Sequence, residues 1–98
     1  MSDPTASAAQ QPWRVEVSAR ARRDVQRLPP RIATAVVEFV THVLPENPER
    51  ISKPLTGELA GLRSARRGDY RVLFELHSEA RVILVARIGH RAHIYRAE

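Results

Sequence analysis

The chain has 98 residues, a length that corresponds to one small domain. It contains no cysteine, which excludes disulfide bridges, thiolate metal ligands and cysteine nucleophiles. No apolar run approaches the ~18 residues that a transmembrane helix requires, and no secretory signal pattern is found at the N-terminus. We therefore expect a cytoplasmic protein that does not contact a membrane.

Positive charge is concentrated in the second half of the chain. The net charge is +5, and Lys53 is the only lysine among the 16 Lys and Arg residues. Residues 1–49 contain six arginines and six acidic residues, whereas residues 50–98 contain ten cations and five acidic residues. A coding bias toward arginine gives no reason to deplete acidic residues from one half. The asymmetry therefore favours a polyanion-binding site in the second half over a merely solvated basic surface.

An N-terminal strand and two helices are predicted in the first half. Residues 1–12 are small and polar and predict a mobile tail, so we expect the domain to span 13–98. Alternating apolar residues predict a half-buried strand over 13–17, after which Ser18 can cap a helix that ends at Pro29. Helical apolar spacing predicts a second helix over 30–44. The short connection predicts a helical hairpin that packs on one face of a sheet.

Strands are predicted in most of the second half. Residues 46–61 contain several prolines and glycines and are predicted as a loop. Three strands are then predicted over 62–67, 70–77 and 81–88, with tight turns between them. Gly89 is expected to end the third strand, and 92–96 is a candidate short edge strand. The order β-α-α-β-β-β predicts an α+β domain with helices on one face of an antiparallel sheet.

A first cluster of candidate functional residues surrounds the turn between the first two of these strands. Alternate residues of paired strands share a face, so Arg66 or Arg67 can lie beside Arg71. Like charges that face each other across strands destabilise a sheet. A fold that keeps these arginines together therefore indicates an anion-binding site. The alternative is an ordinary surface on which Asp69 and Glu75 neutralise the arginines.

The C-terminal segment contains a second cluster: His90, Arg91, His93, Tyr95 and Arg96. Histidine can transfer protons, arginine can stabilise a phosphate in the transition state and tyrosine can stack on a base. A nuclease that uses no metal needs these groups, although an edge strand with a solvated polar face also accounts for them. No acidic residue or cysteine lies close in sequence to the two histidines, so no metal site is predicted. No cofactor-binding motif is present either.

Three sequence blocks resemble the RelE toxins of bacterial and archaeal toxin–antitoxin pairs. They are S-A-R-A-R-R-D-V-Q-R-L-P-P from Ser18, K-P-L-T-G-E-L-A-G-L-R-S-A-R-R-G-D-Y-R-V-L-F from Lys53, and I-G-H-R-A-H-I-Y-R from Ile88. The resemblance extends from about Val15 to Tyr95 and implies a RelE-like fold. It also implies an mRNA interferase that enters the ribosomal A site. Such an enzyme cuts mRNA without a metal, by attack of the RNA 2′-hydroxyl on the adjacent phosphate.

The resemblance implies roles for individual residues. Arg71 matches the family arginine that stabilises developing charge, and Tyr95 matches the tyrosine that stacks on the substrate base. Arg91 matches an arginine implicated in stabilising the phosphate or protonating the leaving group, and His90 completes the expected catalytic set. Contacts with RNA are expected from six further basic residues of the second half: Lys53, Arg63, Arg66, Arg67, His93 and Arg96.

The sequence departs from the best-studied branch of the family in the strand before the Tyr-Arg pair. That branch has two lysines there, one of them a proposed general base, whereas Leu62 and Ser64 occupy these positions here. Arg63 lies between them and should point to the opposite face. Arginine is a poor base because it keeps its proton at neutral pH. Either His90 or His93 therefore handles protons, or cleavage depends on charge stabilisation and on positioning by the ribosome.

The resemblance also implies partners. A cognate antitoxin should cover the basic face and the apolar groove around the helices, and operator DNA should be bound only by the toxin–antitoxin complex. Two other functions remain open: a ParE-like poison of DNA gyrase, and a relative that binds the ribosome or RNA without cutting. The set of His90, Arg91 and Tyr95 favours the interferase over the gyrase poison. The missing lysines keep the non-cleaving alternative open.

Overall fold

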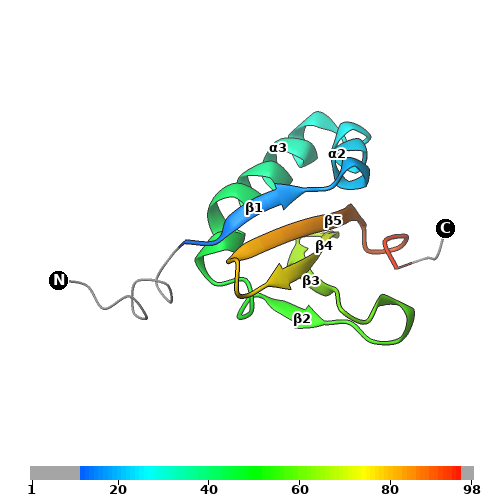
Figure 1. The fold of residues 1–98 in the computed structure, drawn as a ribbon. Coiled ribbons are helices and arrows are strands. Elements are labelled where there is room, and N and C mark those ends of the chain that lie inside the picture. The colour runs from blue at the N-terminus through cyan, green and yellow to red at the C-terminus, as the bar shows by residue number, and fades with distance from the viewer. Residues whose placement is uncertain (1–11, 96–98) are drawn as a thin grey trace.

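The computed structural model describes residues 12–95. β1 (Arg14–Val17) leads into α2 (Ala19–Gln26) and α3 (Pro30–Glu38), which continues as a π-helix (Phe39–Val43) and a 3₁₀ turn (Leu44–Glu46). The remaining elements are β2 (Ser52–Pro54), a 3₁₀ turn (Gly57–Leu59), β3 (Arg63–Arg67), β4 (Tyr70–His77) and β5 (Val82–His90). Both helices cover the same face of the sheet (Figure 1), which confirms the α+β prediction. The predicted tail, except Pro12, and Arg96 lie outside the described residues.

The five strands form one sheet in the order β1-β5-β4-β3-β2. β1 runs parallel to β5, whereas the other neighbouring pairs are antiparallel. The prediction of a wholly antiparallel sheet is therefore wrong at this edge. The parallel pair joins the first and last strands of the chain, and turn signals in a sequence predict only pairing between neighbours.

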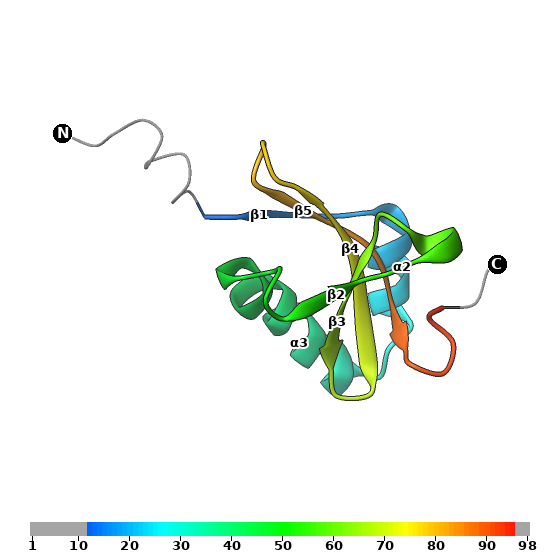
Figure 2. The same ribbon diagram turned by 90° about the horizontal axis from the view of Figure 1, so that it is seen from below.

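β2 is a strand that the sequence did not predict, because residues 46–61 were expected to form a loop. It has three residues, one of them proline, which cannot donate to a ladder and is compatible with an edge position. β2 pairs with β3 at the edge of the sheet and lies in front of it in Figure 2. Arg63 of β3 stabilises the position of β2 through three hydrogen bonds. Its Nε donates to Ser52 Oγ at 2.7 Å, and its Nη2 donates to the carbonyl oxygens of Glu49 and Ser52, both at 3.2 Å.

β5 continues through Gly89 to His90, so the prediction that Gly89 ends the strand is wrong. A Cβ atom added at Gly89 would lie 3.1 Å from Ile94 Cδ1. The glycine therefore permits a close approach of the C-terminal segment to the sheet. Residues 91–95 form turns instead of the predicted edge strand, and Ile94 is buried.

The core lies between the helices and the sheet. The second predicted helix contributes Val36, Phe39, Val40 and Leu44, and the two central strands contribute Val72, Phe74, Ile83, Val85 and Ile88. The helical residues belong to the apolar spacing that predicted a helix over 30–44, and the strand residues lie in the predicted strands 70–77 and 81–88. None of the helices in residues 12–95 has the length and apolar character of a membrane span.

Two polar side chains attach the first helix to β5, where the pairing of β5 with β4 shifts register. Ser18 Oγ accepts a hydrogen bond from the Ala21 amide at 3.0 Å and donates one to the Ala86 carbonyl at 2.9 Å. Asp24 Oδ2 accepts from the Ile88 amide at 3.0 Å. These bonds satisfy backbone groups at an irregularity, where the ladder itself leaves groups unpaired.

Candidate functional site

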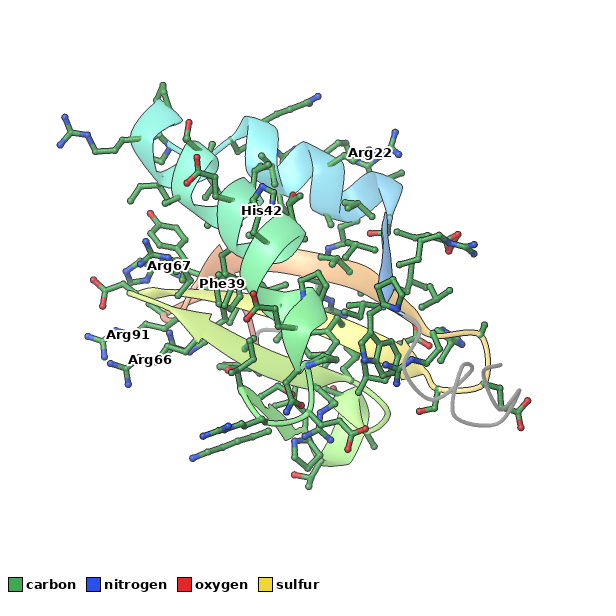
Figure 3. All side chains as sticks on the ribbon, turned by 90° about the vertical axis from the view of Figure 1, so that its left-hand side faces the viewer. Arg22, Phe39, His42, Arg66, Arg67 and Arg91 are labelled. Atoms are coloured by element: carbon green, nitrogen blue, oxygen red, sulfur yellow. The ribbon has the colours of Figure 1, made fainter. Side chains whose placement is uncertain are left out.

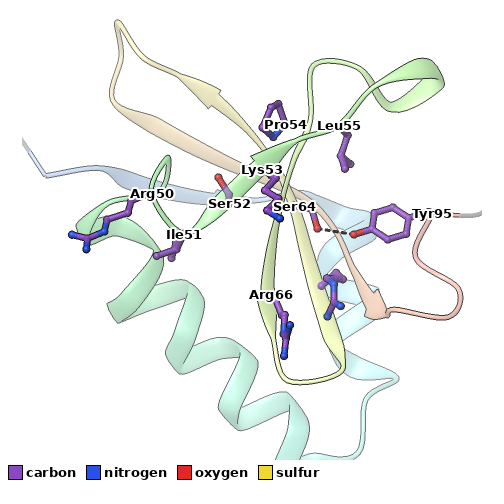
Figure 4. Close-up of a pocket in the computed structure, with 10 residues that line it drawn as sticks. Arg50, Ile51, Ser52, Lys53, Pro54, Leu55, Ser64, Arg66 and Tyr95 are labelled. Carbon is purple, nitrogen blue, oxygen red and sulfur yellow. Dashed lines mark hydrogen bonds between the residues drawn. The ribbon is translucent and has the colours of Figure 1, made fainter.

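The sheet face away from the helices carries a cationic pocket of about 530 Å³ (Figure 4). Its lining consists of residues from β2, β3, β4 and the C-terminal turn: Arg50, Ile51, Ser52, Lys53, Pro54, Leu55, Ser64, Arg66, Arg71 and Tyr95. Four of these side chains are cations and none is acidic. The pocket is therefore suited to an anionic ligand.

Arg66 and Arg71 face each other directly across β3 and β4, so the structure brings Arg66 rather than Arg67 beside Arg71. Arg71 Nη1 donates to the carbonyl oxygens of Gly68 and Tyr70, both at 3.1 Å. Within residues 12–95, neither Arg66 nor Arg71 forms an ion pair with a carboxylate. Directly opposed like charges destabilise a sheet, and a bound phosphate would relieve their repulsion.

Tyr95 brings an aromatic ring to this pocket. Its hydroxyl oxygen lies 2.9 Å from Ser64 Oγ, as the dashed line in Figure 4 shows. Ser64 pairs with Lys53 of β2, so the tyrosine lies close to the cationic lining. Tyr95 is 43% exposed, which leaves it available for stacking on a nucleic-acid base.

Arg91 lies at the hairpin end of β3 and β4, outside the pocket lining. Its backbone N–H donates to the Asp69 carbonyl at 2.8 Å, and its Nε lies 3.7 Å from Asp69 Oδ1. Figure 3 shows Arg66 and Arg91 extending from the same end of the sheet, whereas Arg67 lies on the side of the helices. Arg91 can therefore contact a ligand that extends from the pocket past the hairpin.

The two C-terminal histidines lie near each other but do not line the pocket. Their ring centroids are 6.0 Å apart, and the His90 ring packs edge-on against Tyr70 at 5.4 Å. His90 Nδ1 accepts a hydrogen bond from the Ala92 amide at 3.1 Å. Among the described side chains, no three His, Asp or Glu residues are placed to hold a metal ion.

The structure separates two other expected RNA contacts from the pocket. Arg63 is bound to the β2 backbone, and it lies opposite Phe74 on the helix-covered face. Arg67 pairs with Tyr70 on that same face. Conversely, the sequence did not single out Arg50 or Leu55, which reach the pocket because β2 is part of the sheet. Only recognition of β2 could have identified them.

Sequence comparison with known proteins finds matches to toxins of toxin–antitoxin systems. Residues 15–95 match the family described as the ParE toxin of the type II toxin–antitoxin system parDE. The chain is 49% identical to Toxin RelG and 47% identical to Toxin RelE, both of Mycobacterium tuberculosis. Each alignment spans 85 residues, which is 87% of this chain and 98% or 88% of the relative.

Solved structures show the same fold. A chain of the RelBE2 toxin–antitoxin complex from Mycobacterium tuberculosis superposes with a TM-score of 0.79 at 47% identity, over 83% of this chain and 100% of that chain. The archaeal RelE–RelB complex from Pyrococcus horikoshii gives a TM-score of 0.65 at 28% identity, over 85% and 99% of the two chains. These matches confirm the resemblance predicted from the three sequence blocks. The chain therefore belongs to the ParE toxin family and is a RelE-like toxin of a type II toxin–antitoxin system.

Proposed function

We propose that this toxin is a ribosome-dependent mRNA endoribonuclease. The observation that carries the proposal is the pocket on the open face of the sheet, where four cations and one tyrosine meet without an acidic residue. A single-stranded RNA presents phosphates to cations and unstacked bases to aromatic rings. The sequence identity to Toxin RelG and Toxin RelE supports the same assignment.

In the proposed reaction the 2′-hydroxyl oxygen of one nucleotide attacks the adjacent phosphorus. The bond from phosphorus to the 5′-oxygen of the next nucleotide breaks, which leaves a cyclic phosphate and a 5′-hydroxyl group. Negative charge develops on the phosphate oxygens during this step. Arg71, whose Nη1 is fixed by two carbonyl groups, and Arg66 opposite it are positioned to stabilise that charge.

The pocket lining contains neither a histidine nor a carboxylate that could act as a general base. Its ionisable side chains are those of arginine, lysine and tyrosine, and His90 and His93 lie elsewhere. Charge stabilisation by the arginines and positioning of mRNA by the ribosome must then supply most of the rate. The same observation favours a second candidate function, in which the protein blocks translation by binding mRNA on the ribosome without cutting it.

We propose further that a cognate antitoxin inhibits the toxin at two surfaces. An apolar groove of about 790 Å³ lies between β1, α2 and α3, and Val37 at its wall is 47% exposed. An amphipathic segment can bury apolar side chains in this groove, while acidic residues pair with the cationic pocket. The RelBE2 chain was solved in a toxin–antitoxin complex and the Pyrococcus horikoshii chain in a RelE–RelB complex, which supports such a partner. Operator DNA is proposed as a ligand of the complex only.

Primer extension on mRNA from a programmed ribosome tests the enzymatic proposal. We expect discrete cuts within the A-site codon when the wild-type toxin is added, and an uncut message with Arg71→Ala. Arrested ribosomes on an intact message would instead establish the non-cleaving inhibitor. Absence of any ribosome effect, together with gyrase-dependent DNA damage, would establish the ParE-like alternative.

A further inference from the structure

Arg87 is a cation of the open sheet face that the proposed mechanism does not use. It lies on β5 opposite Leu73, whose neighbour on β3 is Ser64 of the pocket. Its Nη1 atom is buried and, within the part of the chain that the structure describes, has no hydrogen-bond partner. A buried charged N–H group without a partner has lost its hydrogen bonds to water without forming others, which costs free energy. A bound ligand that accepts a hydrogen bond from this group would remove that cost.

The surroundings of Arg87 indicate where this ligand would lie. Arg87 lines a hollow of about 340 Å³ together with Thr56, Glu58, Leu59 and Tyr95. Tyr95 also lines the cationic pocket, so its side chain borders both spaces. An RNA base stacked on Tyr95 would therefore have the cationic pocket on one side and Arg87 on the other.

The strand register gives the spacing between the two arginines. Arg71 pairs with Gly89, so Arg87, two residues earlier on β5, is its diagonal neighbour on the same face. Diagonal neighbours on adjacent strands lie about 7–8 Å apart at the backbone, and long side chains extend this reach. This separation suits two successive phosphates of a single-stranded RNA.

We infer that Arg87 forms a second phosphate subsite. The RNA phosphate bound there lies on the other side of Tyr95 from the phosphate that Arg66 and Arg71 bind. The inference deepens the proposed function, because it takes RNA as the ligand, but it does not require that the RNA be cut. Of the residues that line the two hollows, only Glu58 is acidic, and it is exposed. Glu58 forms no ion pair with Arg87 in the described structure, so its carboxylate would repel the phosphate instead.

Binding of a short 2′-O-methyl oligoribonucleotide tests this subsite, because that RNA lacks the nucleophile and stays intact. We expect Arg87→Gln to weaken binding about tenfold and to lower the slope of log affinity against log salt by ~0.7, the value for one single-strand phosphate contact. Arg87→Lys should keep most of the slope, and Glu58→Gln should strengthen binding. Arg31→Gln is the matched control, because it removes the same charge from an exposed position on the helix side.

Two results would overturn the inference. One is an Arg87→Gln variant that binds the oligonucleotide as well as Arg31→Gln does. The other is an equal loss of thermal stability in Arg87→Gln and Glu58→Gln with RNA binding unchanged, because Glu58 would then be the partner of Arg87. Failure of this inference can be distinguished from failure of the proposed function. A wild-type toxin that leaves ribosome-bound mRNA intact refutes cleavage, whereas the salt slope of oligonucleotide binding still reports the phosphate contact of Arg87.

Discussion

The hydroxyl group of Tyr95 lies 2.9 Å from the hydroxyl oxygen of Ser64, which joins the C-terminal turn to the middle of β3. The preceding residue of the same turn, Ile94, approaches Gly89 on β5 closely. The aromatic wall of the cationic pocket is thus held by residues 31 positions apart in the chain. The pocket is complete only when the turn folds back onto the open face of the sheet.

The hydrogen bond between Ser64 and Tyr95 can be tested by removing either hydroxyl. We expect Ser64→Ala and Tyr95→Phe each to reduce single-turnover cleavage about two- to tenfold, since one hydrogen bond contributes ~0.5–1.5 kcal/mol. The double variant should be no worse than either single variant, because both remove the same bond. Tyr95→Ala should cost more, since it also removes stacking worth ~1–3 kcal/mol. Additive effects of the two hydroxyl deletions would show that the bond is not used.

The close approach at Gly89 predicts that a larger side chain displaces the C-terminal turn. An alanine Cβ would lie 3.1 Å from Ile94 Cδ1, so Gly89→Ala requires a small shift and Gly89→Val a larger one. We expect Gly89→Val to reduce cleavage at least about tenfold, because loss of stacking on Tyr95 alone has that magnitude. Thermal denaturation measured alongside should show a folded protein, since Gly89 faces away from the main core. Full activity of Gly89→Val would contradict this account of the turn.

The attachment of the first helix to β5 predicts a stability effect far from the pocket. Asp24→Ala leaves the Ile88 amide without its acceptor, and we expect a loss of ~1–3 kcal/mol in the free energy of unfolding. Ser18→Ala removes a helix cap and should cost ~1 kcal/mol. Urea unfolding measures both, with the exposed Arg23→Ala in the same helix as the control. An Asp24→Ala variant as stable as Arg23→Ala would contradict the proposed role of this carboxylate.

Regular elements of this fold could be predicted from local periodicity. The apolar stripe over 30–44 and the alternation in β4 both match the core that the structure shows, because each pattern repeats over several turns or residue pairs. β2 could not be predicted, because three residues with a proline form a strand only through pairing with β3 and the Arg63 bonds. Likewise, no local signal indicates that β1 pairs with β5 or that Gly89 receives Ile94.

The candidate site, like the fold, could be predicted from the sequence only in part. Arg66 and Arg71 lie opposite each other because side chains alternate along the two strands that meet at a tight turn. The sequence predicted that either Arg66 or Arg67 lies beside Arg71. The position of Tyr95 depends on how the C-terminal turn folds onto the sheet, whereas the sequence predicted a strand there. Local patterns therefore identified three of the four pocket cations, Lys53, Arg66 and Arg71, but neither Arg50 nor the position of the Tyr95 ring that forms the pocket wall.

Stabilisation of the reacting phosphate by the Arg66–Arg71 pair underlies the proposed cleavage of ribosome-bound mRNA. The most direct test is the single-turnover cleavage rate on a programmed ribosome for wild type, Arg71→Ala, His90→Ala, His93→Ala and the control Arg31→Ala. We predict that Arg71→Ala lowers the rate by about 10²–10³, as expected for loss of a preorganised donor, with smaller losses for either histidine variant and none for the control. An Arg71→Ala variant that cuts as fast as wild type would show that this pair does not stabilise the reacting phosphate.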